Sequence, residues 1–189
     1  MHIVSGKFKN QKLIVPKGSL TRPTSSRLRE SLFNICQSYI EDVYFLDIFA
    51  GSGAIGFEAL SRGAKHVTFI DSSKEAIKAI QDNAKKLSCL QQTTILYGDV
   101  FEQLAKLEKR EVSFDIIYAD PPYDAFKGDL SFSALILEMV DKGNLLNRNG
   151  ELFIEDSSDS IPSVKNLQTL KLKSARKSGR SFLQQYIVV

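Results

Sequence analysis

Residues 120–123 of this 189-residue chain are Asp-Pro-Pro-Tyr, a sequence that can hold a planar amine. Two prolines remove backbone donors and stiffen the loop, so the carbonyl of Pro121 can act as a fixed acceptor beside the carboxylate of Asp120. Two acceptors without a donor suit an NH2 group, and they would favour a more pyramidal nitrogen that can attack a methyl group. Asp120 could then take or relay the released proton, and the ring of Tyr123 offers a surface on which a nucleobase can stack. Asp120, Pro121, Pro122 and Tyr123 are the candidate catalytic residues, and a plain strand end is the competing interpretation.

A second stretch has the glycine spacing of a nucleotide-cofactor loop. Gly51, Gly53 and Gly56 spell G-x-G-x-x-G between a predicted strand and a predicted helix, where the missing Cβ atoms let backbone approach a ligand. Asp71 ends the next predicted strand, and 71 − 51 = 20 is the spacing at which an acid binds ribose hydroxyls. Asp47 and Asp99 are also assigned to strand ends in the same crevice. A tight turn with no ligand is the competing interpretation.

The charges around this loop separate two classes of cofactor. The pyrophosphate of a nicotinamide or flavin dinucleotide needs amide donors and positive charge, whereas the sulfonium and amino group of S-adenosylmethionine are cationic and tolerate acids. Asp47 precedes the glycines, and residues 44–60 contain no Lys or Arg. The sequence therefore favours S-adenosylmethionine, and a dinucleotide oxidoreductase is the weaker alternative.

The elements that must position both loops alternate along the chain. Short apolar runs predict five strands, at 43–49, 65–71, 93–97, 114–119 and 152–155. Helical patterns lie between them, at 54–62, after Ser72, at 100–107 and at 132–140. This alternation predicts a parallel sheet with helices on both faces. Two further strands, 167–173 and 182–189, are predicted to form an antiparallel hairpin around a basic loop at 174–181.

Local signals add details to this outline. Ser72 and Glu75 predict a capping box for the helix that follows the second strand. Asn149 and Gly150 predict a turn before the strand at 152–155. Residues 3–15 are predicted to form a short hairpin or extended arm outside the main fold.

The first helix is predicted to begin near Ser25. Its apolar side chains recur at helical spacing, at Leu28, Leu32, Ile35, Cys36, Tyr39 and Ile40. Arg27, Arg29 and Glu30 fall off this apolar stripe.

The charges of the chain are distributed unevenly. Residues 1–29 contain seven Lys or Arg and no acid, and residues 160–189 contain six and no acid. The middle therefore carries 25 − 13 = 12 basic residues against all 22 acids, a net charge of −10. Basic ends favour a polyanion partner, although solvated surface is the plainer interpretation of any one lysine. The candidate RNA-binding residues are Lys7, Lys9, Lys12, Arg27, Arg176, Lys177 and Arg180.

Composition limits the class of protein. Hydrophobic residues make up 43% and charged residues 25%, values that exclude a largely disordered or fibrous chain. No signal-peptide or membrane-spanning run is present, so a cytoplasmic location is expected. Cys36 and Cys89 are far apart and without a C-x-x-C partner, so buried reduced thiols are expected rather than a disulfide or metal site. A monomer is the default expectation for the oligomeric state.

The motifs together resemble the class I S-adenosylmethionine-dependent methyltransferases and, within them, the RsmD type of bacterial 16S rRNA guanine-N2 methyltransferases. The resemblance lies in IVSGKFKNQKL, RPTSSRLRESLFN at 22–34, LDIFAGSGAIGFEALSRGA at 46–64, and DPPY at 120–123. It implies a Rossmann-like seven-stranded, mostly parallel sheet in the order 3-2-1-4-5-7-6. The length of the chain predicts one domain over 1–189, with a basic arm at 1–23 and a catalytic core at 24–189. Tyr123 stands where many relatives have Phe, and either ring can stack.

The same resemblance implies roles for individual residues. Gly51 and Gly53 would hold the methionine portion of the cofactor, Asp71 its ribose and Asp99 its adenine amine, with Arg22 and Thr24 near the methionine end. The full set of predicted cofactor-binding residues is Arg22, Thr24, Asp47, Phe49, Ala50, Gly51, Ser52, Gly53, Asp71, Ser72, Asp99, Val100 and Asp120. The expected activity is methylation of the N2 amine of one guanine in 16S rRNA of the small ribosomal subunit. An adenine-N6 nucleic-acid methyltransferase and a non-catalytic RNA-binding protein are the alternatives.

Overall fold

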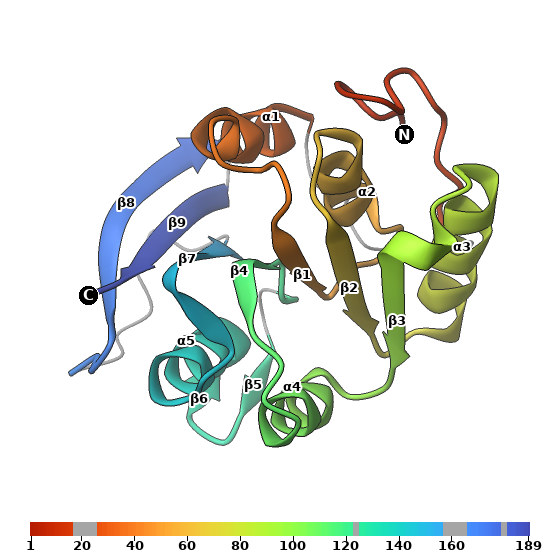
Figure 1. Cartoon of the computed structure of the whole chain (residues 1–189). Helices are drawn as coiled ribbons and strands as arrows, with labels where there is room; N and C mark the ends of the chain where they lie inside the picture. The colour runs from red at the N-terminus through yellow and green to blue at the C-terminus, as the bar shows by residue number, and fades with distance from the viewer. Residues whose placement is uncertain (17–25, 123–124, 157–165, 179–180) are drawn as a thin grey trace. The chain divides into compact units, whose positions relative to one another are not determined.

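The computed structural model describes residues 1–16, 26–122, 125–156, 166–178 and 181–189, with only the backbone of residues 26, 27 and 178 (Figure 1). The chain divides into two compact units, Met1–Gln103 and Leu104–Val189. The single domain expected for residues 1–189 stays a prediction. No helix in the described part of the chain is long and apolar enough to cross a bilayer.

The first unit is built on three parallel strands. β1 (Tyr44–Ile48) pairs with β2 (His66–Asp71), which pairs with β3 (Thr93–Tyr97). The helices are α1 (Ser26–Cys36), α2 (Ala54–Ser61) and α3 (Lys74–Lys86), and a short 3-10 turn, η1 (Leu90–Gln92), precedes β3. Helix α2 lies against β1 and β2, and α3 lies against β2 and β3 (Figure 1). Apolar side chains of both helices are buried.

Gly56 allows α2 to approach the strands closely. A Cβ atom at this position would lie 2.3 Å from the ring of Phe69 and 2.7 Å from Val67, both on β2. Because packed interiors leave no room for such an overlap, only glycine fits here without moving the core. The third glycine of the motif therefore has a packing role.

The N-terminal segment packs on the first unit, and the expected position outside the main fold is wrong. Its hairpin character is confirmed by an antiparallel bridge between His2 and Lys12. Ile3 and Leu13 are 1% and 2% exposed, so their side chains belong to the core. The segment runs beside α2 and α3 (Figure 1), and we call residues 1–16 the arm.

Two buried polar side chains fasten the arm to these helices. Glu58 of α2 accepts hydrogen bonds from the backbone N–H groups of Val4 and Ser5, at 2.8 and 3.0 Å. Asn83 of α3 donates to the carbonyl of Ile14 at 2.9 Å and accepts from its N–H at 2.7 Å. Both Glu58 and Asn83 have 0% exposure. Burial of this kind cannot be inferred from the arm's own polar sequence.

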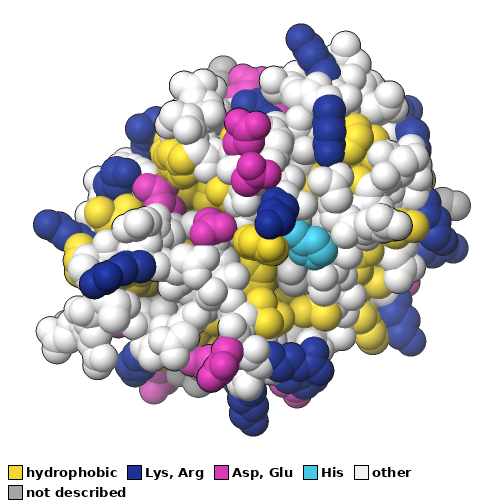
Figure 2. All heavy atoms as spheres, in the orientation of Figure 1, with side chains coloured by type: hydrophobic (Ala, Val, Ile, Leu, Met, Phe, Trp, Pro, Cys, Tyr) yellow, Lys and Arg dark blue, Asp and Glu magenta, His cyan; other side chains and the backbone are white. Residues whose placement is uncertain are grey.

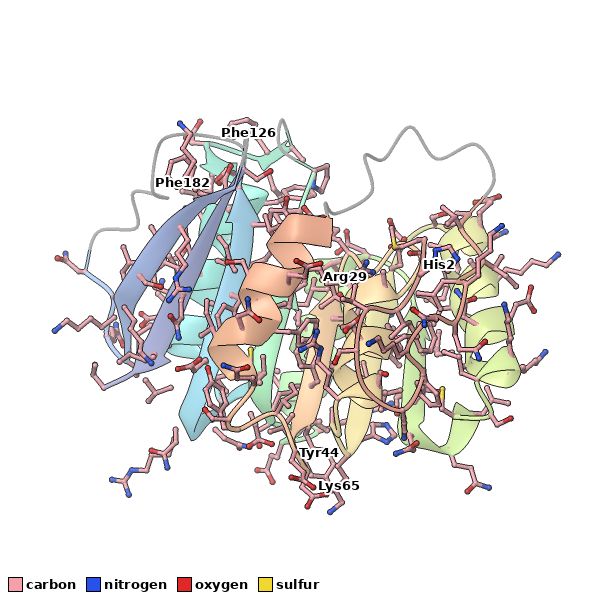
Figure 3. All side chains as sticks on the ribbon, turned by 90° about the horizontal axis from the view of Figure 1, so that it is seen from above. His2, Arg29, Tyr44, Lys65, Phe126 and Phe182 are labelled. Atoms are coloured by element: carbon pink, nitrogen blue, oxygen red, sulfur yellow. The ribbon has the colours of Figure 1, made fainter. Side chains whose placement is uncertain are left out.

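One prediction on the helices of this unit is wrong, and one charged residue off the apolar stripe of α1 is buried. The cap of α3 is Ser73 rather than Ser72, because the Ser73 hydroxyl accepts from the N–H of Ala76 at 3.2 Å. Arg29 does not face solvent: it is 4% exposed and lies on the side of α1 toward α2 (Figure 3). Burial lowers the pKa of its guanidinium, and the nearby carboxylate of Glu58 opposes that shift. The apolar spacing of α1 gave no sign of this buried charge.

The second unit carries the remaining strands. β4 (Phe114–Ala119) is parallel to β7 (Leu146–Asp156), and β9 (Ser181–Val188) is antiparallel to both β7 and β8 (Leu170–Ser178). A small separate hairpin consists of β5 (Phe126–Lys127) and β6 (Leu130–Ser131). Helix α5 (Phe132–Lys142) contacts β7, and α4 (Val100–Lys109) spans the boundary between the two units.

Two turn and loop predictions in this unit are wrong. Asn149 and Gly150 form no turn but lie inside β7, where the register with β4 shifts between Phe114 and Ile116. The basic residues Arg176 and Lys177 belong to β8, not to a loop, because they pair with β9. At Arg176 and Lys177 the partner strand β9 extends β8 beyond its apolar residues.

The seven long strands follow the order β3-β2-β1-β4-β7-β9-β8. Since β5 and β6 form their own sheet between β4 and β7 in the chain, this order differs from the predicted 3-2-1-4-5-7-6 only in its labels. The α/β class with a mostly parallel, Rossmann-like sheet is confirmed. The bounds predicted for β3 and β4 agree with the structure, and Cys36 and Cys89 are buried free thiols, as expected.

Candidate active site

The loop between β1 and α2 forms a tight left-handed turn. Phe49, Gly51 and Gly53 have φ angles of 60°, 54° and 75°. Glycine adopts such angles without strain, whereas a bulky residue such as Phe49 does so only where its surroundings hold it, and such residues cluster at functional sites. The N–H of Gly53 donates to the carbonyl of Ala50 at 2.7 Å, which closes the turn.

Open space lies beside the first glycine of this loop. A Cβ atom built on Gly51 meets no atom within 4 Å, in contrast to Gly53, where it would lie 2.7 Å from the ring of Phe57. The backbone at Gly51 is therefore accessible to a ligand, while Gly53 is required by the packing beneath it. Ser52 is buried, and its carbonyl accepts a hydrogen bond from Asn83 at 3.2 Å.

Asp71 joins the glycine loop to the end of β2. One carboxylate oxygen accepts from the N–H of Gly51 at 2.8 Å, and the other accepts from the N–H of Ser73 at 2.8 Å. The side chain is half-buried, and each carboxylate oxygen can accept more than one hydrogen bond. The predicted pair Gly51 and Asp71 is thus brought together, with acceptor capacity left for ribose hydroxyls.

Asp47 is the penultimate residue of β1, so its predicted place at the carboxyl end of the strand is confirmed. It is 2% exposed and accepts from the N–H of Gly56 at 2.9 Å. A carboxylate at this point stabilises the positive, N-terminal end of α2. Its contact with a cofactor stays a prediction.

The remaining cofactor candidates of this unit follow β2 and β3. Asp99 is exposed and accepts from the N–H of Glu102 at 3.1 Å, so it caps the start of α4. The carbonyl of Asp71 accepts from the N–H of Gly98 at 3.1 Å, which fixes the loop before Asp99 against the end of β2. Ser72 is exposed and Val100 is buried. Arg22 and Thr24 lie outside the described residues.

The acceptor loop follows β4 in the second unit. Asp120 is half-buried, Pro121 is buried and Pro122 is exposed. The carbonyl of Pro122 accepts from the N–H of Ala125 at 3.1 Å, whereas Tyr123 lies outside the described residues. Just before the loop, the hydroxyl of Tyr118 donates to Glu155 of β7 at 2.8 Å, and both side chains are buried. This bond holds the end of β4, which positions Asp120.

The basic candidates lie on both units. Lys7, Lys9 and Lys12 are exposed on the arm, where the ammonium group of Lys7 also donates to Gln92 at 3.0 Å. Arg176 and Lys177 are exposed on β8, and the side chains of Arg27 and Arg180 lie outside the described residues. Among the described residues on the face seen in Figure 2, Lys and Arg side chains stand apart from one another.

Sequence reasoning missed two buried polar residues, Asn83, which supports the glycine loop, and Glu58, which fastens the arm. Asn83 links the arm to the carbonyl of Ser52, and Glu58 binds both the arm and the Nε of Arg62, at 2.8 Å. An acid in the otherwise apolar helix AIGFEALS was the available signal for Glu58. Asn83 follows Ala79 and Ile80 by one helical turn, on the buried face of α3, which indicates burial but not its partners.

Known proteins are similar to this chain along most of its length. A family model described as "Conserved hypothetical protein 95" matches residues 1–187. The "Ribosomal RNA small subunit methyltransferase D" of Haemophilus influenzae is 31% identical over 175 residues, which cover 92% of this chain and 88% of that protein. The structure of a hypothetical protein from Thermus thermophilus has a TM-score of 0.82 and 25% identity, covering 100% of this chain and 99% of that one.

A more distant structure extends the likeness in fold. The ribosomal protein L11 methylase of Lactobacillus delbrueckii subsp. bulgaricus has a TM-score of 0.71 at 18% identity, and the match covers 97% of this chain and 89% of that one. At this identity the likeness concerns the fold alone.

Proposed function

The chain belongs to the family described as "Conserved hypothetical protein 95", and from this premise we propose that it is an S-adenosylmethionine-dependent rRNA methyltransferase. We propose as its substrate the exocyclic N2 amine of one guanine in 16S rRNA. The observation that carries the proposal is the bond between Gly51 and Asp71, because it sets an accessible glycine backbone beside a carboxylate with spare acceptor capacity.

The residues of the first unit fit the proposed cofactor. The accessible backbone at Gly51 would receive its methionine portion, Asp71 would accept from its ribose hydroxyls, and the exposed carboxylate of Asp99 would accept from its adenine amine. Phe49, Ala50, Ser52, Gly53, Ser72 and Val100 would line this site, with Arg22 and Thr24 at the methionine end. When bound, S-adenosylmethionine supplies the electrophilic methyl group.

Asp120 and Pro121 would orient the amine and remove its proton. Accepting both N–H hydrogens turns the nitrogen lone pair out of conjugation with the ring, toward the methyl group. Asp120 and Pro121 would thus hold the amine nitrogen facing the methyl group that the cofactor supplies, so no covalent enzyme intermediate would be needed. The methylated nitrogen is strongly acidic, so the Asp120 carboxylate can take its proton and pass it to solvent. Tyr123 would stack on the guanine, which must leave its own base stack to reach the loop.

The RNA would be held by charges on the two acid-free ends of the chain. Lys7, Lys9, Lys12, Arg27, Arg176, Lys177 and Arg180 are proposed to contact phosphates, a mode of binding that depends on salt but not on base sequence. Because phosphate contacts do not distinguish bases, the acceptor loop and its surroundings would select the guanine.

Methyl transfer tests this proposal directly. Labelled S-adenosylmethionine is incubated with small-subunit rRNA and with small-subunit particles, using wild type, Asp120→Ala, and Glu138→Ala as a control in the same unit. We expect transfer by wild type and by the control, and loss of transfer in Asp120→Ala with cofactor affinity retained. Full activity of Asp120→Ala would refute the proposed role of that residue.

Two further readouts separate the alternatives. Nucleoside analysis of the product distinguishes N2-methylguanosine from N6-methyladenosine, which the same four-residue loop could also form. Affinity for a cofactor analogue is compared between wild type and Asp71→Ala. Unchanged affinity in Asp71→Ala, together with no methyl transfer by wild type, would favour a non-catalytic RNA-binding protein.

A further inference from the structure

The β5–β6 hairpin exposes an aromatic side chain directly after the acceptor loop. Phe126 is 62% exposed, more than any other aromatic side chain in the described part of the chain. The hairpin turns at Gly128, which has a φ of 65°, so the turn leaves Phe126 near its open end. A large apolar ring held in water loses the free energy of burial, so its position calls for an explanation beyond folding.

Backbone hydrogen bonds fix the hairpin to the acceptor loop. The N–H of Ala125 donates to the carbonyl of Pro122 at 3.1 Å, and the carbonyl of Ala125 accepts from the N–H of Phe132 at 3.0 Å. The Ser131 hydroxyl accepts from the N–H of Ala134 at 3.2 Å, which caps α5. Phe126 is therefore held at a set position relative to Pro122 and is not a side chain on a loose loop.

A second aromatic ring lies at the same end of this unit. Phe182 pairs with Asp156, the last residue of β7, and it is labelled with Phe126 at that end in Figure 3. The ammonium group of Lys177 lies 5.4 Å from the centre of the Phe182 ring. Ala119, the last residue of β4, pairs with Ile154 of β7. Phe182 and Lys177 therefore lie at the same end of the strands as Asp120, which follows β4 directly.

Simpler explanations account for part of this arrangement. Single exposed aromatic residues are common on protein surfaces, and lysines on an edge strand such as β8 discourage aggregation. Neither explains why two rings and a cation share one end of the unit beside an acceptor loop. Rings with a neighbouring cation are the combination that binds single-stranded nucleic acid, because every base has a face for stacking and every link has a phosphate.

We propose that Phe126, Phe182 and Lys177 form a stacking surface for the unpaired nucleotides next to the target base. The proposal rests on the proposed function and adds the residues that would hold the flanking RNA. Phe126 would stack on one neighbouring base, and Phe182 with Lys177 would contact the base and phosphate beyond it. The target base would thereby be kept out of its own stack.

The hairpin offers a matched control for the test. Phe126 pairs with Ser131 and Lys127 pairs with Leu130, so Leu130 is on the opposite face and is 38% exposed. Binding of labelled single-stranded 16S rRNA fragments and the kinetics of methyl transfer are measured for Phe126→Ala, Phe126→Trp and Leu130→Ala. We expect Phe126→Ala to weaken RNA binding and raise the KM for RNA about tenfold, as for the loss of one stacked base.

The other measurements must follow this pattern. Phe126→Trp and Leu130→Ala should bind RNA within about twofold of wild type, cofactor affinity should be unchanged, and thermal unfolding should show that all variants fold. Lys177→Ala should weaken RNA binding more than Lys171→Ala, which removes a charge elsewhere on β8. Equal RNA affinity of Phe126→Ala and Leu130→Ala would overturn the proposal.

Two outcomes keep this proposal separate from the proposed function. Failure of the wild type to methylate any RNA refutes the proposed function. The comparison of RNA affinity between Phe126→Ala and Leu130→Ala tests the stacking surface independently of methyl transfer. A loss seen only with assembled small-subunit particles, and not with the RNA fragments, would assign Phe126 to a protein contact and would also overturn the stacking surface.

Discussion

Replacing Glu58 by Ala is expected to lower the free energy of unfolding by about 3–5 kcal/mol, the cost of removing one partner from a buried charge pair. The side chain has 0% exposure and accepts three hydrogen bonds, from Val4 and Ser5 of the arm and from Arg62. Its loss would leave the buried guanidinium of Arg29 without its nearby carboxylate. Nε and Nη1 of Arg29 already have no hydrogen-bond partner among the described residues.

Two more substitutions divide this cost into its parts. Glu58→Gln keeps one acceptor oxygen but removes the charge, so we expect a loss of about 2 kcal/mol, the scale of one hydrogen bond to a charged group. Glu30→Ala removes an exposed acid that also acts on Arg29, and it should cost at most about 1 kcal/mol because solvent screens it. A domain with a total stability of about 5–15 kcal/mol can show these differences clearly.

Urea unfolding followed by circular dichroism gives the free energies, and amide hydrogen exchange gives the local effect. The amides of Val4 and Ser5 should lose protection in Glu58→Ala, because their acceptor is gone. The arm should then present its lysines poorly, so the KM for RNA should rise while the affinity for a cofactor analogue stays unchanged. A free energy of unfolding within about 1 kcal/mol of wild type, with Val4 and Ser5 still protected, would refute this account of the arm.

Three further substitutions test the packing, the loop support and a charge. Gly56→Ala should cost about 1–3 kcal/mol in urea unfolding, because its Cβ would lie 2.3 Å from Phe69; an unchanged midpoint would contradict the close approach. Asn83→Ala should reduce affinity for a cofactor analogue several-fold, since the carbonyl of Ser52 loses its donor, and unaltered affinity in calorimetry would rule out this support. Burial raises the pKa of Asp141. Hydrogen bonds from three backbone N–H groups and one hydroxyl together lower the pKa by more than burial raises it, so the net shift is downward. The stability that Asp141 contributes is therefore present above its unfolded pKa of about 3.9 and is lost as pH falls through the lower folded value. Asp141→Asn should be less stable than wild type at pH 7, with a smaller deficit at about pH 3, and a deficit independent of pH would contradict this.

Local patterns in the sequence were sufficient to predict most strands of the sheet. The apolar run that forms β4 carries its own signal, since a strand buried on both faces needs consecutive apolar residues and little else. The glycine motif and the acid 20 positions later also predicted that Gly51 and Asp71 would act together, and the structure joins them by a hydrogen bond. In each case the relevant interactions lie within one element or one short crossover unit.

Predictions failed where residues outside an element decide its structure. Ser72 and Ser73 compete for one cap, and the choice depends on the bond from Ser73 to Asp71 at the end of β2. Arg176 and Lys177 form a strand only because β9 supplies partners for them. Polar sequence alone favours a loop at such positions, because it carries no information about the neighbouring strand.

The sequence by itself determined the chemistry available to this protein: a glycine loop, acids that suit a cationic cofactor, and an acceptor loop without donors. Only the tertiary structure decided which polar residues are buried and what they hold. The sequences of their helices do not show which groups Glu58 and Asn83 bind. Both bind backbone groups of the arm more than 50 positions away. Burial of a charge depends on surfaces that meet only after folding, and periodicity along one helix cannot encode it.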